Sequence, residues 1–269
     1  MIKPKALILT GYGINCDDET CYAFEKAGAL SSILHINDII SNPEMLKEFQ
    51  IIAFPGGFSF GDDTGSGKAL ANRIRNSLYD DFKHFIERDT LMLGICNGFQ
   101  VMVNLGIIPG IGGIMTEAQV SLEPNRSLNY ECRWIDLKIE KNSSSIFTKG
   151  IDMLHLPVAH GEGNFYAPKE TITKIEEMGL VTMRYSFPDG KPCNSEFPCN
   201  PNGSINDIAA ISDKSGRIMG IMPHPERNIL FTHRDDWTFL KEKLKREGKN
   251  ISEEGEGIQI FKNAVRYYE

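Results

Sequence analysis

The stretch Leu91-Met-Leu-Gly-Ile-Cys96-Asn-Gly-Phe-Gln100 is an apolar run that stops at a cysteine between two glycines and then resumes with helix-type spacing. This order predicts a buried strand, a sharp turn and a helix. Glycines on both sides of the cysteine, in the pattern Gly94-x-Cys96-x-Gly98, allow the backbone to make a strained turn that lifts one side chain above the edge of a sheet. The pattern therefore predicts a nucleophile elbow that presents a thiol.

Two effects of the predicted helix would activate the Cys96 thiol. The N-terminal end of a helix favours a thiolate over a thiol, and the backbone N–H of Asn97 would point at negative charge forming beside the sulfur. The same pattern also fits a buried, inert cysteine in a core strand, because free cysteine is among the most buried residue types. A base elsewhere in the chain has to separate the two interpretations.

Strand and helix patterns alternate along the chain up to Leu105. The sequence predicts strands at Ala6–Leu9, Ser32–His35, Ile51–Phe54 and Leu91–Ile95, and helices at Asp17–Ala27 and Ala69–Arg88. This alternation predicts an α/β fold with an open, mostly parallel sheet and helices on both faces. In such sheets ligands bind at the carboxyl ends of the strands, where Pro55-Gly-Gly57 and Cys96 both fall.

The second half of the chain is richer in strands, which we expect to complete the same sheet. The predicted strands are Trp134–Ile139, Met153–Val158, Val181–Tyr185, Ile208–Ser212 and Ile218–Met222. Residues 186–204 are rich in proline and glycine and are predicted to form a long surface loop. The Lys- and Glu-rich residues 240–257, within a charged segment at 231–257, are predicted to be a solvated helix or a loose connection before a last helix, Ile258–Tyr268. We therefore expect residues 1–269 to form a single domain.

Bulk composition limits the classes of partner. The 269 residues are 41% hydrophobic and 24% charged, which is ordinary for a globular protein with a packed core. A net charge of −7 without a basic cluster argues against nucleic acid. The chain has no run of about 18 apolar residues, and its first apolar segment is too short for a signal peptide, so we expect no membrane association and a cytoplasmic location.

Cysteine and glycine patterns exclude several other sites. The six cysteines, at positions 16, 21, 96, 132, 193 and 199, form no Cys-x-x-Cys pair, so the sequence predicts neither a zinc knuckle nor a disulfide framework. Gly11-x-Gly13 lacks the third glycine of a dinucleotide site. Gly65-Ser-Gly-Lys68 lacks both the preceding glycine and the following Ser or Thr of a phosphate loop. We expect no nucleotide site in this chain.

A candidate base lies in Gly220-Ile-Met-Pro223-His224-Pro225-Glu226-Arg227, at the end of a predicted strand. Because residues before proline are pushed toward extended geometry, His224 and Glu226 should share one face, with alpha carbons roughly 6.5 Å apart. A glutamate on one imidazole nitrogen leaves the other nitrogen for the Cys96 thiol, which is the logic of a catalytic triad. A surface His–Glu pair is the alternative.

A metal site could in principle be built from the histidines and glutamates of the second half of the chain. His155, His160, Glu162, His224 and Glu226 match no closed set of ligand spacings. We therefore predict no metal site.

The segments Gly94–Gln100 and Pro223–Arg227 resemble the signatures of class I glutamine amidotransferases. Further segments resemble one subfamily, the glutaminase subunits of phosphoribosylformylglycinamidine synthase in purine biosynthesis; these are Gly13–Asp17, Pro55–Asp62, Tyr130–Trp134, Ala159–Gly163 and Asn200–Ser204. The resemblance runs nearly end to end. It implies hydrolysis of L-glutamine to glutamate and ammonia through a cysteine thioester, with the ammonia supplied to a large ATP-dependent synthetase subunit that converts formylglycinamide ribonucleotide to the amidine.

The resemblance also implies roles for individual residues. Cys96 would be the nucleophile, His224 the base and then the acid, and Glu226 the orienting group. The backbone N–H groups of Gly57 and Asn97 would form the oxyanion hole. The other residues implied to contact substrate or border the pocket are Gln100, His160, Gly161 and Glu162. An exposed helix position for Gln100, and plain loop packing for residues 160–162, are the alternatives.

Cofactors and partners follow from the same resemblance. It implies no cofactor in this chain, with ATP and magnesium on the synthetase subunit, and it leaves open whether a small third subunit is needed. Two other functions also fit the residues. One is an independent cysteine hydrolase that acts on another amide or γ-glutamyl bond, and the other is a non-catalytic regulatory subunit on the same fold.

Overall fold

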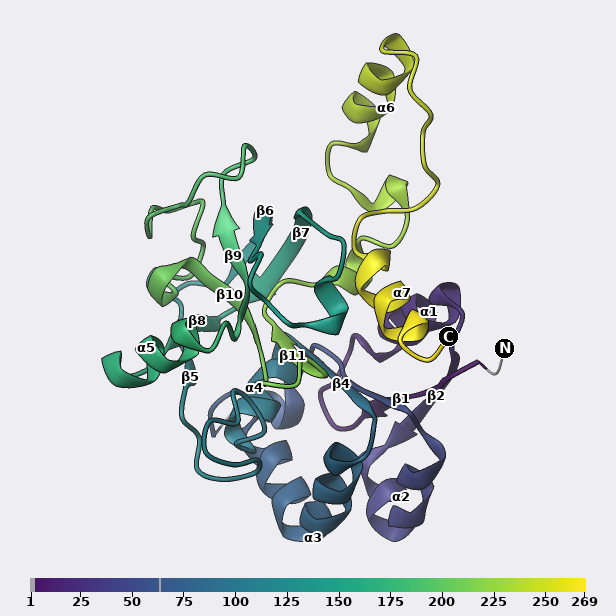
Figure 1. Cartoon of the computed structure of the whole chain (residues 1–269), viewed down its shortest axis with the longest axis vertical. Helices are drawn as coiled ribbons and strands as arrows, with labels where there is room; N and C mark the ends of the chain where they lie inside the picture. Colours follow the sequence, from purple (N-terminus) through teal and green to yellow (C-terminus); the bar gives the residue numbers. More distant parts are fainter. Residues whose placement is uncertain (1–2, 63) are drawn as a thin grey trace.

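The computed structural model describes residues 3–62 and 64–269 (Figure 1). Within these ranges a nine-stranded sheet has the strand order β2-β1-β3-β4-β11-β10-β9-β6-β7. Its strands are β1 (Lys5–Thr10), β2 (Leu30–His35), β3 (Ile51–Phe54), β4 (Leu91–Ile95), β6 (Glu131–Ile139), β7 (Met153–His160), β9 (Val181–Ser186), β10 (Ile208–Ser212) and β11 (Ile218–Ile221). A separate two-stranded sheet pairs β5 (Ser121–Pro124) with β8 (Glu162–Tyr166).

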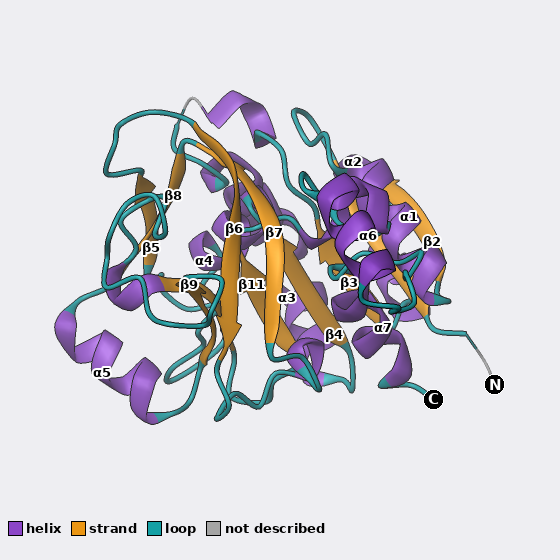
Figure 2. Cartoon of the chain, turned by 90° about the horizontal axis from the view of Figure 1, so that it is seen from above, coloured by secondary structure: helices purple, strands orange, loops and turns teal. Residues whose placement is uncertain are grey.

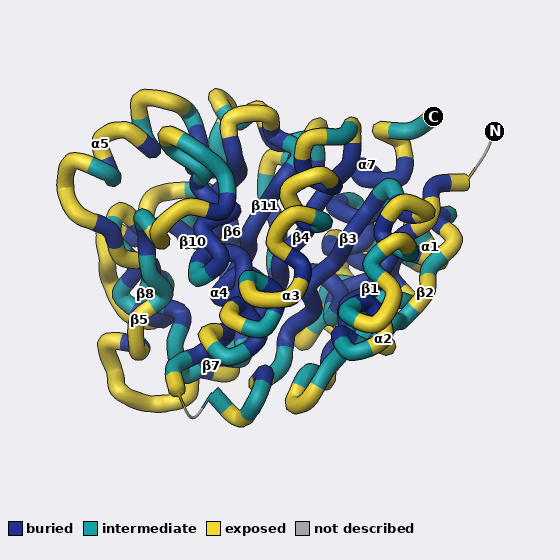
Figure 3. Tube along the Cα trace, turned by 90° about the horizontal axis from the view of Figure 1, so that it is seen from below, coloured by how far each residue is buried: buried dark blue, intermediate teal, exposed yellow. Residues whose placement is uncertain are grey.

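The helices cover both faces of the large sheet. They are α1 (Asp17–Ala27), α2 (Ile36–Ser41), α3 (Lys68–Glu87), α4 (Asn97–Asn104), α5 (Lys169–Glu177), α6 (Trp237–Arg246) and α7 (Ile258–Arg266). Around β1, β3 and β4, helices α1 and α7 lie on one side, and α3 and α4 lie on the other (Figures 1 and 2). The strands between these layers are buried along their length (Figure 3).

The predicted α/β class, with an open, mostly parallel sheet, is confirmed. Strands β2, β1, β3, β4 and β11 pair in parallel, whereas β10, β9, β6 and β7 are added by antiparallel pairing, so that only β10 and β6 run in the opposite direction. The antiparallel half has a topological cause. The chain passes from β10 to β11 through a short turn, and a short turn joins only antiparallel neighbours, whereas parallel neighbours need a crossover.

Local signals placed the elements of the first half closely. Strand β4 spans Leu91–Ile95 as predicted, because an unbroken apolar run suits a strand that is buried on both faces. Helix α1 ends at Gly28, whose left-handed φ of 108° lets its N–H bond the carbonyl of Glu25 while the N–H of Ala29 bonds that of Phe24. The helix predicted at Ala69–Arg88 is α3, one residue earlier at each end.

The sequence patterns missed α2, α5, β5 and β8. Helix α2 is too short to show a repeating period. Strands β5 and β8 pair with each other across about forty residues of intervening chain, with Leu122 opposite Phe165. Because that pairing is tertiary, no local alternation marks it.

The prediction of a surface loop at 186–204 is partly wrong, and the segment contains a disulfide that the cysteine pattern did not predict. Cys193 and Cys199 form a disulfide, with alpha carbons 5.5 Å apart. Two successive turns bring these cysteines together. In the first turn the Glu196 N–H donates to the Cys193 carbonyl, and in the second the Asn200 N–H donates to the Glu196 carbonyl. The end of the segment then passes into the interior, where Asn200 and Asn202 are buried. Six-residue cysteine spacing carries no such signal.

The predicted solvated helix is α6, which begins at Trp237, before the predicted residues 240–257, and ends at Arg246. Helix α6 has no buried residue and extends away from the rest of the chain (Figure 1). At its base, Arg234 bonds Asp236 at 2.7 Å and Glu256, in the connection before α7, at 2.6 Å. In the described part of the chain, no helix is long and apolar enough to cross a membrane.

Replacing Phe261 should destabilise the fold. Its ring is fully buried and meets Phe24 of α1 edge to face at 4.9 Å between centroids, so Phe261→Ala leaves a cavity that costs about 3–5 kcal/mol of unfolding free energy. Urea unfolding followed by circular dichroism measures this. Phe239→Ala on α6, where the ring is 70% exposed, is the matched control and should change the unfolding free energy by about 0.5 kcal/mol or less. Equal effects of the two substitutions would contradict the packing described here.

Candidate functional site

Cys96 stands in a strained turn between β4 and α4, as the elbow pattern predicts. Its φ of 51° and ψ of −107° are unusual for a residue with a side chain. The turn needs the following glycine, because a side-chain carbon on Gly98 would overlap the backbone carbonyl of Phe54. The Cys96 side chain itself is almost completely buried.

Pairing of β4 with β11 places the candidate base beside this turn. Ile95 lies opposite Ile221, and the N–H of Cys96 donates to the carbonyl of Ile221 at 2.7 Å. The chain that leaves β11 therefore carries His224 to the end of β4. Strand β7 also reaches this point, because His224 N–H donates to the Pro157 carbonyl at 2.9 Å and the Cys96 sulfur lies 3.8 Å from the Ala159 carbonyl.

His224 and Glu226 form a buried pair. Nδ1 of the imidazole lies 2.6 Å from Oε1 of the carboxylate, and both side chains are shielded from solvent. His224 has the extended backbone that was predicted, but Pro225–Arg227 forms a 3₁₀ turn, so the predicted strand alternation is wrong beyond His224. The turn still brings the carboxylate to Nδ1. Nε2 makes no hydrogen bond within the described residues and stays available for the thiol.

The electrostatics of the pair favour an imidazolium. Burial lowers the pKa of His224, but Glu226 and then Cys96 raise it, and the net pKa lies well above the ordinary value for histidine. The arrangement can therefore hold a nucleophile and a proton carrier side by side.

The two predicted oxyanion donors, one in the loop after β3 and one at the start of α4, lie on segments that contact each other. Gly57 has a φ of 146°, and a side-chain carbon there would come within 2.7 Å of the Gly13 carbonyl. Asn97 is the first residue of α4, and its side-chain oxygen accepts the N–H of Ser59 at 3.2 Å. Neither the Gly57 nor the Asn97 backbone N–H donates a hydrogen bond within residues 3–62 and 64–269. Both are free to bind an oxyanion, and that role stays a prediction.

Gln100 is buried, so the alternative of an exposed helix position is wrong. Its side-chain Nε2 donates to the Glu162 carbonyl at 2.6 Å, and its Oε1 accepts from the Asn97 side chain at 2.9 Å. The bond to Glu162 ties α4 to the turn between β7 and β8, whereas the bond with Asn97 lies within α4. Its predicted contact with glutamine stays a prediction.

Residues His160, Gly161 and Glu162 form that turn, next to the Ala159 carbonyl that faces the thiol. Glu162 accepts the Ser66 N–H at 3.3 Å, and the Gly161 carbonyl accepts the Asn125 N–H at 2.9 Å. The structure thus places all three near Cys96, but their polar atoms are engaged within the chain. Their predicted part in shaping the pocket stays untested.

A buried polar network under His160 was missed by the sequence analysis. Nδ1 of His160 lies 3.0 Å from Oδ1 of Asn125, whose Nδ2 is already used by two carbonyls, so Nδ1 must be the donor. Asn202 lies 3.5 Å from Nε2 of His160 and also donates to the hydroxyl of Tyr185 at 2.9 Å. Burial, and secondarily the charge of His224, lower the pKa of His160 to about 3. The imidazole is therefore neutral.

Cys16 and Arg227 also lie against the pair and were not predicted as site residues. The thiol, His224 and Glu226 offer three atoms within 4.8 Å of one another, a set that could ligate a metal. However, Arg227 Nη2 donates to the Cys16 sulfur at 3.0 Å, so a cation there would face a guanidinium. The donor set suits a network of hydrogen bonds better than a metal centre.

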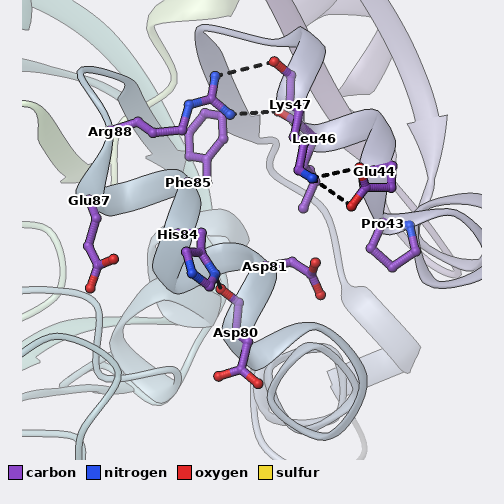
Figure 4. A pocket seen from close by; sticks show the side chains of 10 residues that line it. All are labelled: Pro43, Glu44, Leu46, Lys47, Asp80, Asp81, His84, Phe85, Glu87 and Arg88. Atoms are coloured by element: carbon purple, nitrogen blue, oxygen red, sulfur yellow. Dashed lines mark hydrogen bonds and ion pairs between the residues drawn. The ribbon is translucent and has the colours of Figure 1, made fainter.

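Two cavities of the described chain are lined by neither Cys96 nor the His224–Glu226 pair. A small cavity of about 160 Å³ lies behind Gln100 and Glu162, next to Lys68 and Asn104. A wider surface pocket of about 800 Å³ lies between Pro43 and the C-terminal end of α3, with Arg88 bonded to the carbonyls of Leu46 and Lys47 on one wall (Figure 4). Neither cavity opens onto Cys96.

Comparison with known proteins adds independent information. Residues 3–268 match the family described as CobB/CobQ-like glutamine amidotransferase domain. The chain is 51% identical over 271 residues to phosphoribosylformylglycinamidine synthase subunit PurQ of Methanococcus maripaludis strain C7. That alignment covers 100% of this chain and 99% of the relative. It is 45% identical over 268 residues to the protein of the same name from Dehalococcoides mccartyi, with 99% of this chain and 98% of the relative covered.

A solved structure agrees with these relatives. A chain of the structure named PurLQS from Thermotoga maritima superposes with a TM-score of 0.71 at 25% sequence identity, and the superposition covers 100% of both chains. The shared fold therefore extends over the whole length compared.

The neutral state of His160 predicts a pH dependence of stability. Because its folded pKa lies below the ordinary value of about 6.5, the unfolded chain binds a proton that the folded chain does not, and stability falls as the pH falls through this window. His160→Gln removes this proton, so between about pH 6.5 and about pH 5 it should lose about 2 kcal/mol less unfolding free energy than the wild type. Urea titrations at both pH values measure the difference.

His84→Gln, at an exposed position of α3, is the matched control and should lose as much stability as the wild type. Equal pH dependence in the wild type and His160→Gln would mean that His160 is protonated in the folded state or does not titrate on unfolding.

Proposed function

Because the chain belongs to the PurQ subunits of phosphoribosylformylglycinamidine synthase, within the CobB/CobQ-like glutamine amidotransferases, we propose that it hydrolyses the side-chain amide of L-glutamine at Cys96. The products are glutamate and ammonia. The ammonia serves the synthetase subunit in the conversion of formylglycinamide ribonucleotide to formylglycinamidine ribonucleotide. The reaction belongs to purine biosynthesis, and we place it in the cytoplasm.

One observation carries the proposal for the site. A cysteine in a strained elbow at the end of β4 stands beside a buried His224–Glu226 pair at the end of the neighbouring strand β11. A nucleophile, a base within reach and a group that orients the base are the three parts of a catalytic triad. An inert core cysteine would need none of these neighbours.

The first half of the reaction forms a thioester. The Cys96 thiolate attacks the amide carbon of glutamine, and the carbonyl oxygen becomes an oxyanion; we propose that the N–H groups of Gly57 and Asn97 stabilise it. His224 gives its proton to the departing nitrogen, so that the C–N bond breaks and ammonia leaves. Cys96 then carries a γ-glutamyl group.

The second half returns the enzyme to its starting state. His224, now neutral, takes a proton from water, and the hydroxide attacks the thioester carbon through a second oxyanion. The C–S bond breaks and glutamate is released, which leaves the Cys96 thiolate and the His224 imidazolium. Throughout the reaction, the N–H at Nδ1 of His224 donates a hydrogen bond to the Glu226 carboxylate. This bond keeps Nε2 directed at the thiol.

The partner supplies the rest of the chemistry. We propose that ATP and magnesium bind the large synthetase subunit and that this chain needs no cofactor for glutamine hydrolysis. The pattern of residues 65–68 supports this division, because it lacks the residues of a phosphate loop. Whether a small third subunit joins the complex is open to direct measurement of its stoichiometry.

Covalent labelling tests the nucleophile and the substrate together. A diazo or chloroketone analogue of glutamine should add once to Cys96, in competition with glutamine, in the chain bound to its synthetase. Peptide mapping by mass spectrometry locates the adduct. Cys132→Ala, which removes an exposed free cysteine, should label like the wild type. Labelling at other cysteines, or none with the partner bound, would refute the assignment.

Cys96→Ala should separate the two activities of the complex. Glutamine-dependent synthesis should fall by at least about 10⁴-fold, because no thioester can form. Synthesis from added ammonia should stay near the wild-type rate, because the synthetase site is intact. Both rates are followed by formation of the amidine ribonucleotide, and loss of both would mean that Cys96 serves assembly.

Glu226→Ala should be less damaging than Cys96→Ala. Water can partly replace an orienting carboxylate, so the loss of glutamine-dependent kcat should be about tenfold to a hundredfold smaller. Steady-state kinetics of the three complexes compare the two substitutions with the wild type. An equal or greater loss in Glu226→Ala would contradict a purely orienting role.

A further inference from the structure

Cys16 is a buried thiol beside the His224–Glu226 pair that the reaction above does not use. It directly precedes α1, and its sulfur lies within 4.8 Å of the nearest ligand atoms of both His224 and Glu226. Gly56 makes room for this approach. A side-chain carbon on Gly56 would come within 2.7 Å of His224 Cε1 and 3.2 Å of the Cys16 sulfur.

The Cys16 thiol also contacts the positively charged guanidinium of Arg227. Its Nη2 donates to the Cys16 sulfur at 3.0 Å, and its Nε lies 3.6 Å from Oε1 of Glu19. Arg227 directly follows Glu226 in the chain, yet in the part that the structure describes the two side chains form no ion pair with each other. The guanidinium is instead turned toward Cys16 and α1.

Within the described residues, the carboxylate of Glu226 therefore forms a hydrogen bond with the His224 imidazole alone. Oε1 lies 2.6 Å from His224 Nδ1, while Oε2 is buried and bonded to no atom of the described residues. An arginine and a carboxylate readily form a bidentate pair. If Arg227 turned to Glu226, it would occupy the oxygens that orient His224 and would offset the negative charge that stabilises the imidazolium.

The thiol suits the task of holding Arg227 away. Burial is the main cause that raises the pKa of Cys16, so the sulfur is a neutral thiol that accepts one guanidinium N–H without adding charge next to Glu226. Its backbone has a separate duty. The N–H of Cys16 donates to the Gly56 carbonyl at 3.2 Å, just before the proposed oxyanion donor at Gly57. Side-chain replacement leaves that bond in place.

We propose that Cys16 is a positioning residue of the glutaminase site, whose thiol holds the Arg227 guanidinium and thereby reserves Glu226 for His224. The inference rests on the proposed function, since it assigns a role relative to the same triad. If the proposal is correct, the loss of glutaminase activity in a variant without the Cys16 thiol is caused by Arg227 pairing with Glu226.

The test compares Cys16→Ala, Cys16→Ser and the double variant Cys16→Ala/Arg227→Met, each bound to the synthetase. Cys16→Ala should lower glutamine-dependent kcat by about ten- to a hundredfold, with KM for glutamine within about twofold of the wild type. The basic limb of its kcat against pH profile should move to lower pH, because an imidazolium with a shared carboxylate loses its proton more easily.

The other two variants identify the cause. Cys16→Ser keeps an acceptor for Arg227 and should recover most of the lost kcat. The double variant removes the competing cation and should be more active than Cys16→Ala alone, a non-additive result that simple loss of packing does not produce. Cys21→Ala, a free cysteine of α1 beside Glu25, is the matched control and should behave like the wild type.

The two proposals fail separately. If the wild-type complex neither hydrolyses glutamine nor labels at Cys96, the proposed function is wrong. If the wild type is active but Cys16→Ala keeps its kcat and pH profile, only the positioning role is overturned. The role is also overturned if Cys16→Ala is impaired, retains the wild-type urea midpoint, and is not improved by Arg227→Met or Cys16→Ser.

Discussion

Parallel pairing of β4 with β11 is the constraint on which the site depends. The Ile95–Ile221 register and the bond from Cys96 N–H to the Ile221 carbonyl bring together two strand ends more than a hundred residues apart in sequence. A shift of one residue would turn every side chain of β11 to the other face. Insertion of β11 beside β4, instead of at the edge of the sheet, therefore places the segment that carries His224 next to Cys96.

The antiparallel half of the sheet contributes more than area. Although β7 is the edge strand, its residues Pro157 and Ala159 contact His224 and the Cys96 sulfur. The sheet must therefore curl so that its far edge returns to the elbow, and the turn after β7 carries His160 and Glu162 to the same place. Glu162 then meets Gln100 and Ser66, which couples the β7–β8 turn to both sides of the elbow.

Close backbone approach explains the glycines around the site. Gly57 and Gly98 each face a carbonyl at a distance that excludes a side chain, and Gly56 leaves room for the His224 ring and the Cys16 sulfur. The turn before α1 holds this arrangement, because Phe58 N–H donates to the Gly13 carbonyl at 2.7 Å and Asn15 and Cys16 both donate to Gly56. Backbone hydrogen bonds thus hold the loops around Cys96, while side-chain bonds join Arg227 to Cys16 and Glu226 to His224.

Local patterns in the amino-acid sequence predict the alternating elements of the first half, the elbow at Cys96, and the family resemblance carried by residues 94–100 and 223–227. Those features are local, since a buried strand, a glycine turn and a proline-flanked histidine leave their marks within a few residues. Other features became visible in the folded chain alone: the 3₁₀ turn at Pro225–Arg227, the antiparallel strands, the Cys193–Cys199 bridge, and the contacts of Asn202 and Cys16. Each of these depends on packing between distant segments, whose free energy has no local pattern to reveal it.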